Sequence, residues 1–208
     1  MTEVLPEFHP LDSKRFDAAL RRFDEANARD PNREQFTGIS QPRELLYAKW
    51  LTEWVLRLEP QASEPLRLAA LAQHLCRWEI PRHSFPLTRT GYLKWREALK
   101  RFHAQKAGEI LREVGYPDDV VTRVEDLVRK RNFPTDPESQ VLEDALCLVF
   151  LQHQFADLAA KSSDEKMVSV LQKSWKKMSP KAQEAALTLA YRPNETRLLQ
   201  QALPTRIR

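Results

Sequence analysis

The sequence contains only two cysteines, and neither belongs to a Cys-x-x-Cys pair. Cys76 and Cys147 both fall within apolar patterns of helical period. A cysteine in that position most often behaves as a small buried hydrophobe, and free thiols are typical of a reducing compartment. We therefore expect no disulfide framework and assign neither cysteine a chemical role.

Long apolar runs are also missing. No stretch approaches 18 apolar residues and the mean hydropathy is -0.57, which argues against a membrane span. The first ten residues, MTEVLPEFHP, lack the basic and then apolar order of a secretion signal. From these absences we expect a cytoplasmic protein with no membrane partner.

The glycine-rich motifs of common nucleotide sites and hydrolase sites are absent as well. The chain has no Gly-x-Gly-x-x-Gly, no Gly-Lys-Ser/Thr and no Gly-x-Ser-x-Gly. Lys and Arg total 33 against 29 Asp and Glu, which gives a net charge of only +4. A balance this mild does not indicate nucleic acid, which usually requires a strong local patch of positive charge.

Scarce glycine, together with abundant Leu, Ala, Glu, Lys and Arg, favours helices. The 14 prolines lie mostly between apolar segments of helical period, where they can start and stop helices. We predict an all-α, compact single-domain bundle of about 7–9 helices. The domain spans residues 1–208, with a core at 12–160 and a C-terminal helical extension at 161–208. The expected helices begin near residue 12 and then cover about 42–58, 66–79, 90–114, 117–128, 138–160, 164–177, 179–190 and 194–202, and a polar segment at 33–41 separates the first two.

Four acidic or histidine residues share inward helical faces with apolar neighbours, namely Glu44, His74, His103 and Asp144. Each has an ordinary explanation. A core histidine can bond a carbonyl, Glu44 can complement a helix dipole, and Asp144 can pair with an arginine. Together, two imidazoles and two carboxylates from four helices fit a metal site in a bundle core, with iron, manganese, zinc or nickel as candidates. Both interpretations stay open.

Basic residues follow the same segments and predict an anion site. Arg77 and Arg82 flank the loop after His74, and Lys94 and Arg96 open the helix that carries His103. Lys106 lies one turn beyond His103, close to the same face. Arginine and lysine side chains near a metal are what a phosphorylated ligand requires. The alternative is that these side chains simply face solvent, as most basic residues on helices do.

Five segments resemble one family, the uncharacterised domain of unknown function 4202 family. They are PRELLY at 42–47, AQHLCRWEIPR at 72–82, YLKWR at 92–96, FHAQKAGEIL at 102–111 and LEDALCLVFL at 142–151. The resemblance covers nearly the whole chain and implies no established activity.

More distantly, the order of elements resembles the HD superfamily of helical metal-dependent phosphohydrolases. On that resemblance Glu44 takes the place of the first histidine and the pair Gln73-His74 takes the place of His-Asp. His103 corresponds to an additional histidine and Asp144 to the final aspartate. The resemblance implies a metal-dependent phosphohydrolase, while Glu44, Gln73 and His74 depart from the ligands that such an enzyme carries.

We therefore carry three hypotheses. In the first, Glu44, His74, His103 and Asp144 bind one divalent ion, and the protein binds or hydrolyses a small phosphorylated, nucleotide-like ligand. There Gln73, His74 and Lys106 take the catalytic roles, and four arginines and lysines hold the ligand's anionic oxygens: Arg77, Arg82, Lys94 and Arg96. The second is a metal-free nucleotide-binding, RNA-binding or regulatory module. The third is an interaction protein that uses tryptophan surface, and a homodimer is left open.

Overall fold

The computed structural model describes residues 13–203, and these residues are predominantly helical. The chain clusters into two compact units, residues 1–139 and 140–208, and each is described by itself. Apart from one two-stranded hairpin, the regular structure of the described residues consists of helices, which confirms the all-α prediction. The prediction of one domain with an extension from residue 161 stays a prediction.

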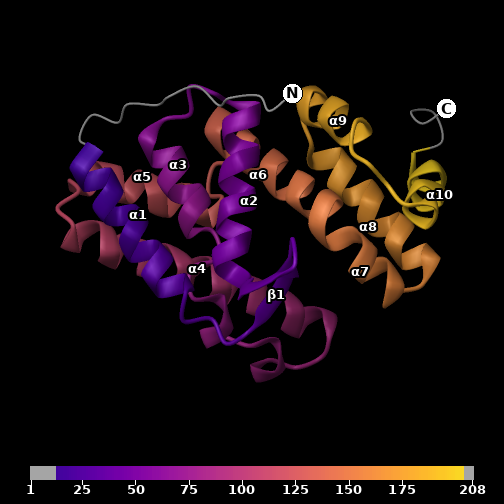
Figure 1. Ribbon diagram of the computed structural model, residues 1–208, viewed down its shortest axis with the longest axis horizontal. Coiled ribbons are helices and arrows are strands. Elements are labelled where there is room, and N and C mark those ends of the chain that lie inside the picture. Colours follow the sequence, from indigo (N-terminus) through magenta and orange to yellow (C-terminus); the bar gives the residue numbers. More distant parts are fainter. Residues whose placement is uncertain (1–12, 204–208) are drawn as a thin grey trace. The chain divides into compact units, whose positions relative to one another are not determined.

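Unit 1 consists of five α-helices and the hairpin (Figure 1). α3 packs against α5, α2 and α1, and α4 packs against α5. Fully buried leucines and valines, such as Leu51, Leu66, Leu111 and Val124, form the core between them. In chain order the elements are α1 (Ser13–Asn27), β1 (Arg33–Phe36), β2 (Ile39–Pro42), α2 (Arg43–Leu58), α3 (Glu64–Ala72), α4 (Arg89–Glu113) and α5 (Asp118–Arg129).

The third helix is shorter than the sequence pattern predicts. We expected it to run to residue 79, but α3 ends at Ala72. The next four residues form turns, and Cys76 adopts a left-handed conformation with φ 52°, which no α-helix can continue. The Cys76 backbone N–H donates to Asn27 Oδ1 at 3.1 Å. The polar residues Gln73 and His74 therefore lie on a turn instead of a helical face.

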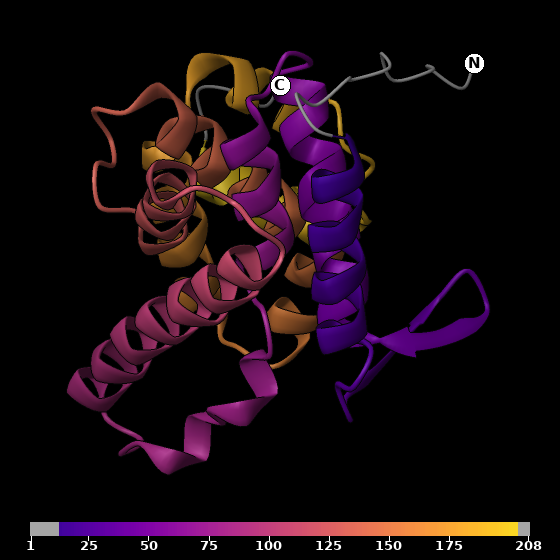
Figure 2. The ribbon, with the colours of Figure 1, turned by 90° about the vertical axis from the view of Figure 1, so that its left-hand side faces the viewer.

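The polar segment between α1 and α2 forms an antiparallel hairpin that the sequence did not predict. Arg33 pairs with Pro42 and Phe36 pairs with Ile39. Thr37 and Gly38 both have positive φ, as the tight turns that match strand twist require. Figure 2 shows the hairpin extending away from the helices of unit 1, and the Phe36 ring meets Trp50 edge-on at 5.3 Å.

Unit 2 consists of the remaining helices, which are α6 (Pro137–Val149), α7 (Phe155–Ala160), α8 (Asp164–Lys177), α9 (Pro180–Leu187) and α10 (Pro193–Ala202). α6 begins just before the boundary between the units. A π-helical turn over Phe150–Gln154 joins α6 to α7, so the helix predicted at 138–160 is confirmed as one continuous helical run. Ser163 and Ser179 cap α8 and α9. Between residues 13 and 203, no helix has the length and apolar character needed to cross a bilayer.

Asp30 fixes the start of α2 and with it the position of Glu44. Its side chain is buried, and Oδ2 accepts the Glu44 backbone N–H at 3.0 Å. Oδ1 accepts both the backbone and the side-chain N–H of Asn32, at 2.9 and 2.8 Å. One carboxylate therefore satisfies donors on both sides of the hairpin.

We expect Asp30→Ala to lower the free energy of unfolding by about 1–3 kcal/mol, because it leaves the buried Glu44 backbone N–H without its acceptor. Urea titration followed by circular dichroism measures the loss. Asp119→Ala is the control, since that aspartate is exposed near the start of α5 and should change stability by no more than about 0.5 kcal/mol. Equal losses in the two variants would contradict the role given to Asp30.

Candidate functional site

The site is built on a carboxylate–imidazole pair in unit 1, in which Glu44 is buried and His74 is partly buried. Glu44 lies in the first turn of α2, and its Oε2 is 3.1 Å from His74 Nδ1. Arg77 Nε is 3.7 Å from the other carboxylate oxygen, so a cation keeps Glu44 an acceptor. Burial raises the pKa of Glu44, and Arg77 and Arg43 oppose that shift. His74 Nδ1 therefore donates to the carboxylate, which leaves its Nε2 with a lone pair.

Two aromatic rings enclose His74. Tyr47, three residues after Glu44 on the same face of α2, stacks on the imidazole at 4.0 Å between centroids with an interplanar angle of 13°. The His103 ring lies 5.9 Å away. The α2 face that carries Glu44 thus also supplies the stacking partner, and His74 has little freedom to turn.

His103, on α4, is held by a backbone carbonyl. Its Nδ1 donates to the Leu75 carbonyl oxygen at 2.7 Å, because a carbonyl can only accept. His103 is only 2% exposed, so water does not solvate its Nε2, and this atom has no hydrogen-bond partner among the described residues. Burial lowers the pKa of His103 to about 3, with His74 adding to the shift. The ring is therefore neutral, and its lone pair is unused.

Gln73 contributes a second unsatisfied atom beside His74. Its Nε2 donates to the Val128 carbonyl at 3.3 Å, which assigns the other amide atom as oxygen. That oxygen, Oε1, is buried without a partner in the described part of the chain. Most buried polar atoms in proteins form hydrogen bonds. The two acceptors without a partner, Gln73 Oε1 on the turn after α3 and His103 Nε2 on α4, therefore need an explanation.

Positive charge surrounds the pair. The pKa of His74 is well below its usual value, first because of burial and then because of four cationic side chains: Arg77, Arg96, Lys130 and Arg43. They come from different segments, the turn after α3, α4, the end of α5 and the start of α2. Glu44 and Glu34, which is 3.8 Å from Arg43, are the acidic partners of this group. The site is neutral at the imidazoles and positive at its rim.

Three other basic residues of the sequence prediction have different surroundings. Arg82 donates to the carbonyls of Phe85, Pro86 and Thr88, so its guanidinium holds a loop. Lys94 is exposed and nine residues before His103, which places it on the opposite side of α4. Lys106 lies 3.8 Å from Glu79.

Asp144 belongs to unit 2 and has partners there. Its Oδ1 accepts the Ser179 backbone N–H at 2.8 Å and the Gln140 side-chain N–H at 2.9 Å. The carboxylate thus fixes the start of α9 to α6. Within residues 13–203, no group of three or more His, Cys, Asp or Glu side chains is placed to hold a metal. The prediction that Glu44, His74, His103 and Asp144 bind a metal stays a prediction. Of these four residues, Glu44, His74 and His103 lie close to one another.

Sequence reasoning did not assign Tyr47, Arg43 or Lys130 to the site. Tyr47 carried a usable signal, because a residue three positions after Glu44 shares its helical face. Arg43 and Lys130 belong to the basic residues near the predicted site in the sequence, but their positions at the ends of α2 and α5 come from the backbone. Lys130 has a left-handed φ of 57°, which no pattern of apolar residues predicts.

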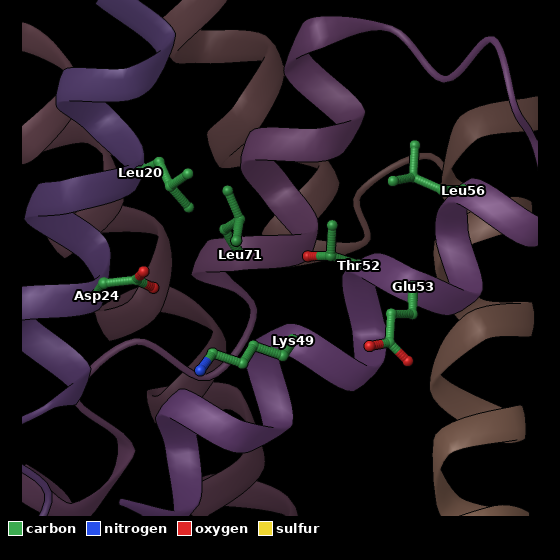
Figure 3. A pocket seen from close by; sticks show the side chains of 7 residues that line it. All are labelled: Leu20, Asp24, Lys49, Thr52, Glu53, Leu56 and Leu71. Atoms are coloured by element: carbon green, nitrogen blue, oxygen red, sulfur yellow. The ribbon is translucent and has the colours of Figure 1, made fainter. Parts of the chain in front are cut away.

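A separate pocket of about 300 Å³ lies between α1 and α2 (Figure 3). Leu20, Leu56 and Leu71 form its apolar wall, and Asp24, Lys49, Thr52 and Glu53 its polar rim. Burial raises the pKa of Asp24 and Lys49 opposes that shift. Its rim carries both signs of charge, and it shares no residue with the group around His74.

The pH dependence of stability tests the neutral, buried state of His103. Its pKa lies near 3 in the folded chain and at its ordinary value of 6.5 when unfolded, so the unfolded chain binds the proton first. We therefore expect the free energy of unfolding to fall by about 2 kcal/mol from His103 alone between about pH 6.5 and pH 5. His103→Gln, whose amide can still donate to the Leu75 carbonyl, should flatten this slope, while exposed His83→Gln should keep it. An unchanged slope in His103→Gln would show that another group titrates.

Comparisons with known proteins agree with the family resemblance and add no activity. No curated protein and no solved structure matches the chain at a significant level. One family model matches residues 17–199, which is most of the chain, and its description is "domain of unknown function (DUF4202)". The chain belongs to the DUF4202 family.

Proposed function

We propose that the protein binds a small phosphorylated ligand at the rim of the Glu44–His74 pair. The observation that carries this proposal is the Arg77 guanidinium 3.7 Å from the Glu44 carboxylate beside His74, together with Arg96, Lys130 and Arg43, whose charges also lower the pKa of His74. A phosphate group is the common biological anion that needs several cationic donors at once. Nucleotides are the ligands that we expect.

Arg77 and Arg96 are the main candidates for contact with the phosphate. Arg77 is partly exposed and lies over the Trp95 ring at 4.8 Å, which fixes the plane of its guanidinium. Arg96 is exposed, donates to the Tyr92 hydroxyl at 3.4 Å and forms no ion pair with a described residue. A preoriented arginine fork loses little freedom when it binds phosphate oxygens.

The neutral imidazoles complement the cations. A phosphate monoester carrying a proton, or a ribose hydroxyl, can donate to His74 Nε2, which is an acceptor in this arrangement. The cations would bind the anionic oxygens while this acceptor recognises a donor group. A simple inorganic anion satisfies only the first of these requirements, so we expect nucleotides to bind more tightly than sulfate.

A thermal-shift screen under chelator tests the proposal. We expect nucleoside phosphates to raise the melting temperature in a concentration-dependent way, because a ligand that binds only the folded state stabilises it. Arg96→Gln and Arg77→Gln should each weaken binding by about tenfold or more, since each removes a charge-assisted hydrogen bond.

The control is Arg101→Gln, an exposed arginine on the same helix that is 3.8 Å from Glu97. It should leave the affinity unchanged within about twofold, because Arg101 is two residues before His103 and therefore on the opposite side of α4. Arg96→Gln is the decisive variant, since Arg96 has no ion pair in the described chain whose loss could disturb the fold. No stabilisation by any phosphorylated ligand, with or without metal, would overturn the proposal.

A second candidate function is a metal-assisted phosphohydrolase, the activity implied by the HD resemblance. The observation that favours it is two buried atoms without a partner among the described residues: His103 Nε2, on a ring 5.9 Å from His74, and Gln73 Oε1, on the residue before His74. Histidines that bind metals usually donate their other ring nitrogen to a carboxylate or a carbonyl. His74 donates to Glu44 and His103 to Leu75, which is the same arrangement.

In this candidate His74 Nε2, His103 Nε2 and Gln73 Oε1 would supply the ligands, and Glu44 would orient His74 instead of ligating the ion. Iron, manganese, zinc and nickel all accept imidazole together with oxygen ligands. A bound divalent ion would polarise a phosphoryl oxygen and lower the pKa of a bound water. Arg77 and Arg96 would keep their role of holding the phosphate.

Elemental analysis of protein purified without added metal tests the second candidate. We expect close to one transition-metal ion per chain, lost in His103→Ala and weakened about 10- to 100-fold in Glu44→Gln, which acts on the orientation of His74. His83→Ala, on an exposed loop, should keep the metal. A metal-free wild type whose melting temperature is unchanged by manganese, iron, zinc or nickel salts would sink this candidate and leave the anion site standing.

A further inference from the structure

A strongly basic stretch borders the site. Residues 80–96 contain four basic residues, Arg82, Arg89, Lys94 and Arg96, and no acidic one, although the chain has 29 Asp and Glu. The small net charge of the whole chain hides this local excess. Arg89 and Arg96 share one face of α4, whereas Lys94 lies on the opposite side, so Arg89 and Arg96 form the local positive charge that attracts an extended anion.

Aromatic and guanidinium groups alternate across the same stretch. The Arg77 guanidinium lies 4.8 Å from the centre of the Trp95 ring. Arg82 lies 5.8 Å from Trp95 and 5.9 Å from Tyr92. The Trp95 indole N–H donates to the Ile80 carbonyl at 2.9 Å. These contacts place Arg77, Trp95, Arg82 and Tyr92 in one stack, with Tyr92 at its outer end.

The loop before α4 holds this stack rigidly. Arg82 donates to the carbonyls of Phe85 and Pro86 at 2.9 and 2.8 Å. Gly91 is packed so closely that a Cβ there would lie 2.1 Å from the Pro86 carbonyl oxygen. Tyr92 is nevertheless 42% exposed. An aromatic ring that is fixed in place and open to solvent is a preformed stacking surface.

Arg96 connects this surface to the His74 site. Its Nη1 donates to the Tyr92 hydroxyl at 3.4 Å, and its charge also lowers the pKa of His74. On α4, Arg96 lies seven residues before His103 and therefore on the same face. Arg89 lies seven residues before Arg96, so the row of positive charge continues toward the start of the helix. Tyr92 and the phosphate site thus form one continuous surface.

We propose that the phosphorylated ligand is the phosphate-bearing end of a single-stranded nucleic acid. This inference rests on the proposed function and names its ligand class. The terminal phosphate binds at Arg77 and Arg96, the adjoining base stacks on Tyr92, and the next phosphate meets Arg89. Stacking on a ring needs an unpaired base, which is why a single strand fits and a duplex does not.

The test compares labelled oligonucleotides and mononucleotides by fluorescence anisotropy under chelator. The probes are short single strands of RNA and of DNA with a terminal phosphate, the same strands without it, their duplexes, and nucleoside monophosphates as competitors. We expect a phosphorylated single strand to bind about tenfold or more tightly than a mononucleotide. Tyr92→Ala should reduce that affinity by about 5- to 100-fold and leave mononucleotide phosphate binding through Arg77 measurable.

Matched variants separate the effects of stacking and of charge from non-specific effects of a substitution on the protein. Phe36→Ala removes another partly exposed ring, on the hairpin, and should leave the affinity for single strands unchanged. Arg89→Gln should lower the affinity for strands about fivefold and reduce the slope of log affinity against log salt by about 0.7, as expected for one lost phosphate contact. Binding of either RNA or DNA supports the inference, and a preference identifies the sugar.

Several outcomes would overturn it. One is strand affinity no greater than that of the mononucleotide, which leaves the proposed function standing; another is equal affinity for duplexes. A third concerns Leu87 and Leu93, which are also exposed near Tyr92, at 86% and 58%. Binding to vesicles of phosphatidylglycerol mixed with phosphatidylcholine, with no binding to single strands, would assign the surface to a membrane. If the wild-type protein bound neither single strands nor mononucleotides, the proposed function would be overturned as well.

Discussion

The hydrogen bond between Glu44 and His74 is the interaction on which the rest of the site depends. It joins the first turn of α2 to the turn after α3 at 3.1 Å, in a place where neither group is well solvated. A buried carboxylate is stable only when donors or cations replace its water, and His74 and Arg77 do so here. Asp30 holds the Glu44 backbone in place, and Tyr47 fixes the ring of His74. The geometry of the site therefore follows from a few buried polar contacts.

The helices were predictable from the sequence, because apolar period and proline placement report local structure directly. α2, α4 and the run from α6 to α7 begin and end close to the expected residues. The end of α3 was not predictable, since Leu75 and Cys76 continue the apolar pattern through a turn. The hairpin at 33–42 was missed because its side chains are mostly polar and exposed, so neither strand shows alternation.

The sequence grouped Glu44, His74, His103 and Asp144, because inward polar residues are few, and the first three lie close to one another. It could not show how they divide their roles. The Leu75 carbonyl that holds His103 has no signature in a sequence, since every residue carries a carbonyl. The partners of Asp144 in unit 2 are hidden for a similar reason, because a backbone N–H at Ser179 is one of them. Patterns of side chains predict which residues are inside, while backbone partners decide what those residues do.

Arg77 contacts Glu44 and is also a proposed contact for the anion, and this double role couples ligand binding to protonation. Its Nε is 3.7 Å from Glu44, and its charge opposes the rise in the pKa of that carboxylate that burial causes. An anion that binds Arg77 competes for this charge and makes the carboxylate easier to protonate. Ligand binding is then coupled to proton uptake, and the heat of binding depends on the ionisation enthalpy of the buffer. On the proposed function, the anion would thus bind more tightly as the solution becomes more acidic, until the ligand itself takes up the proton.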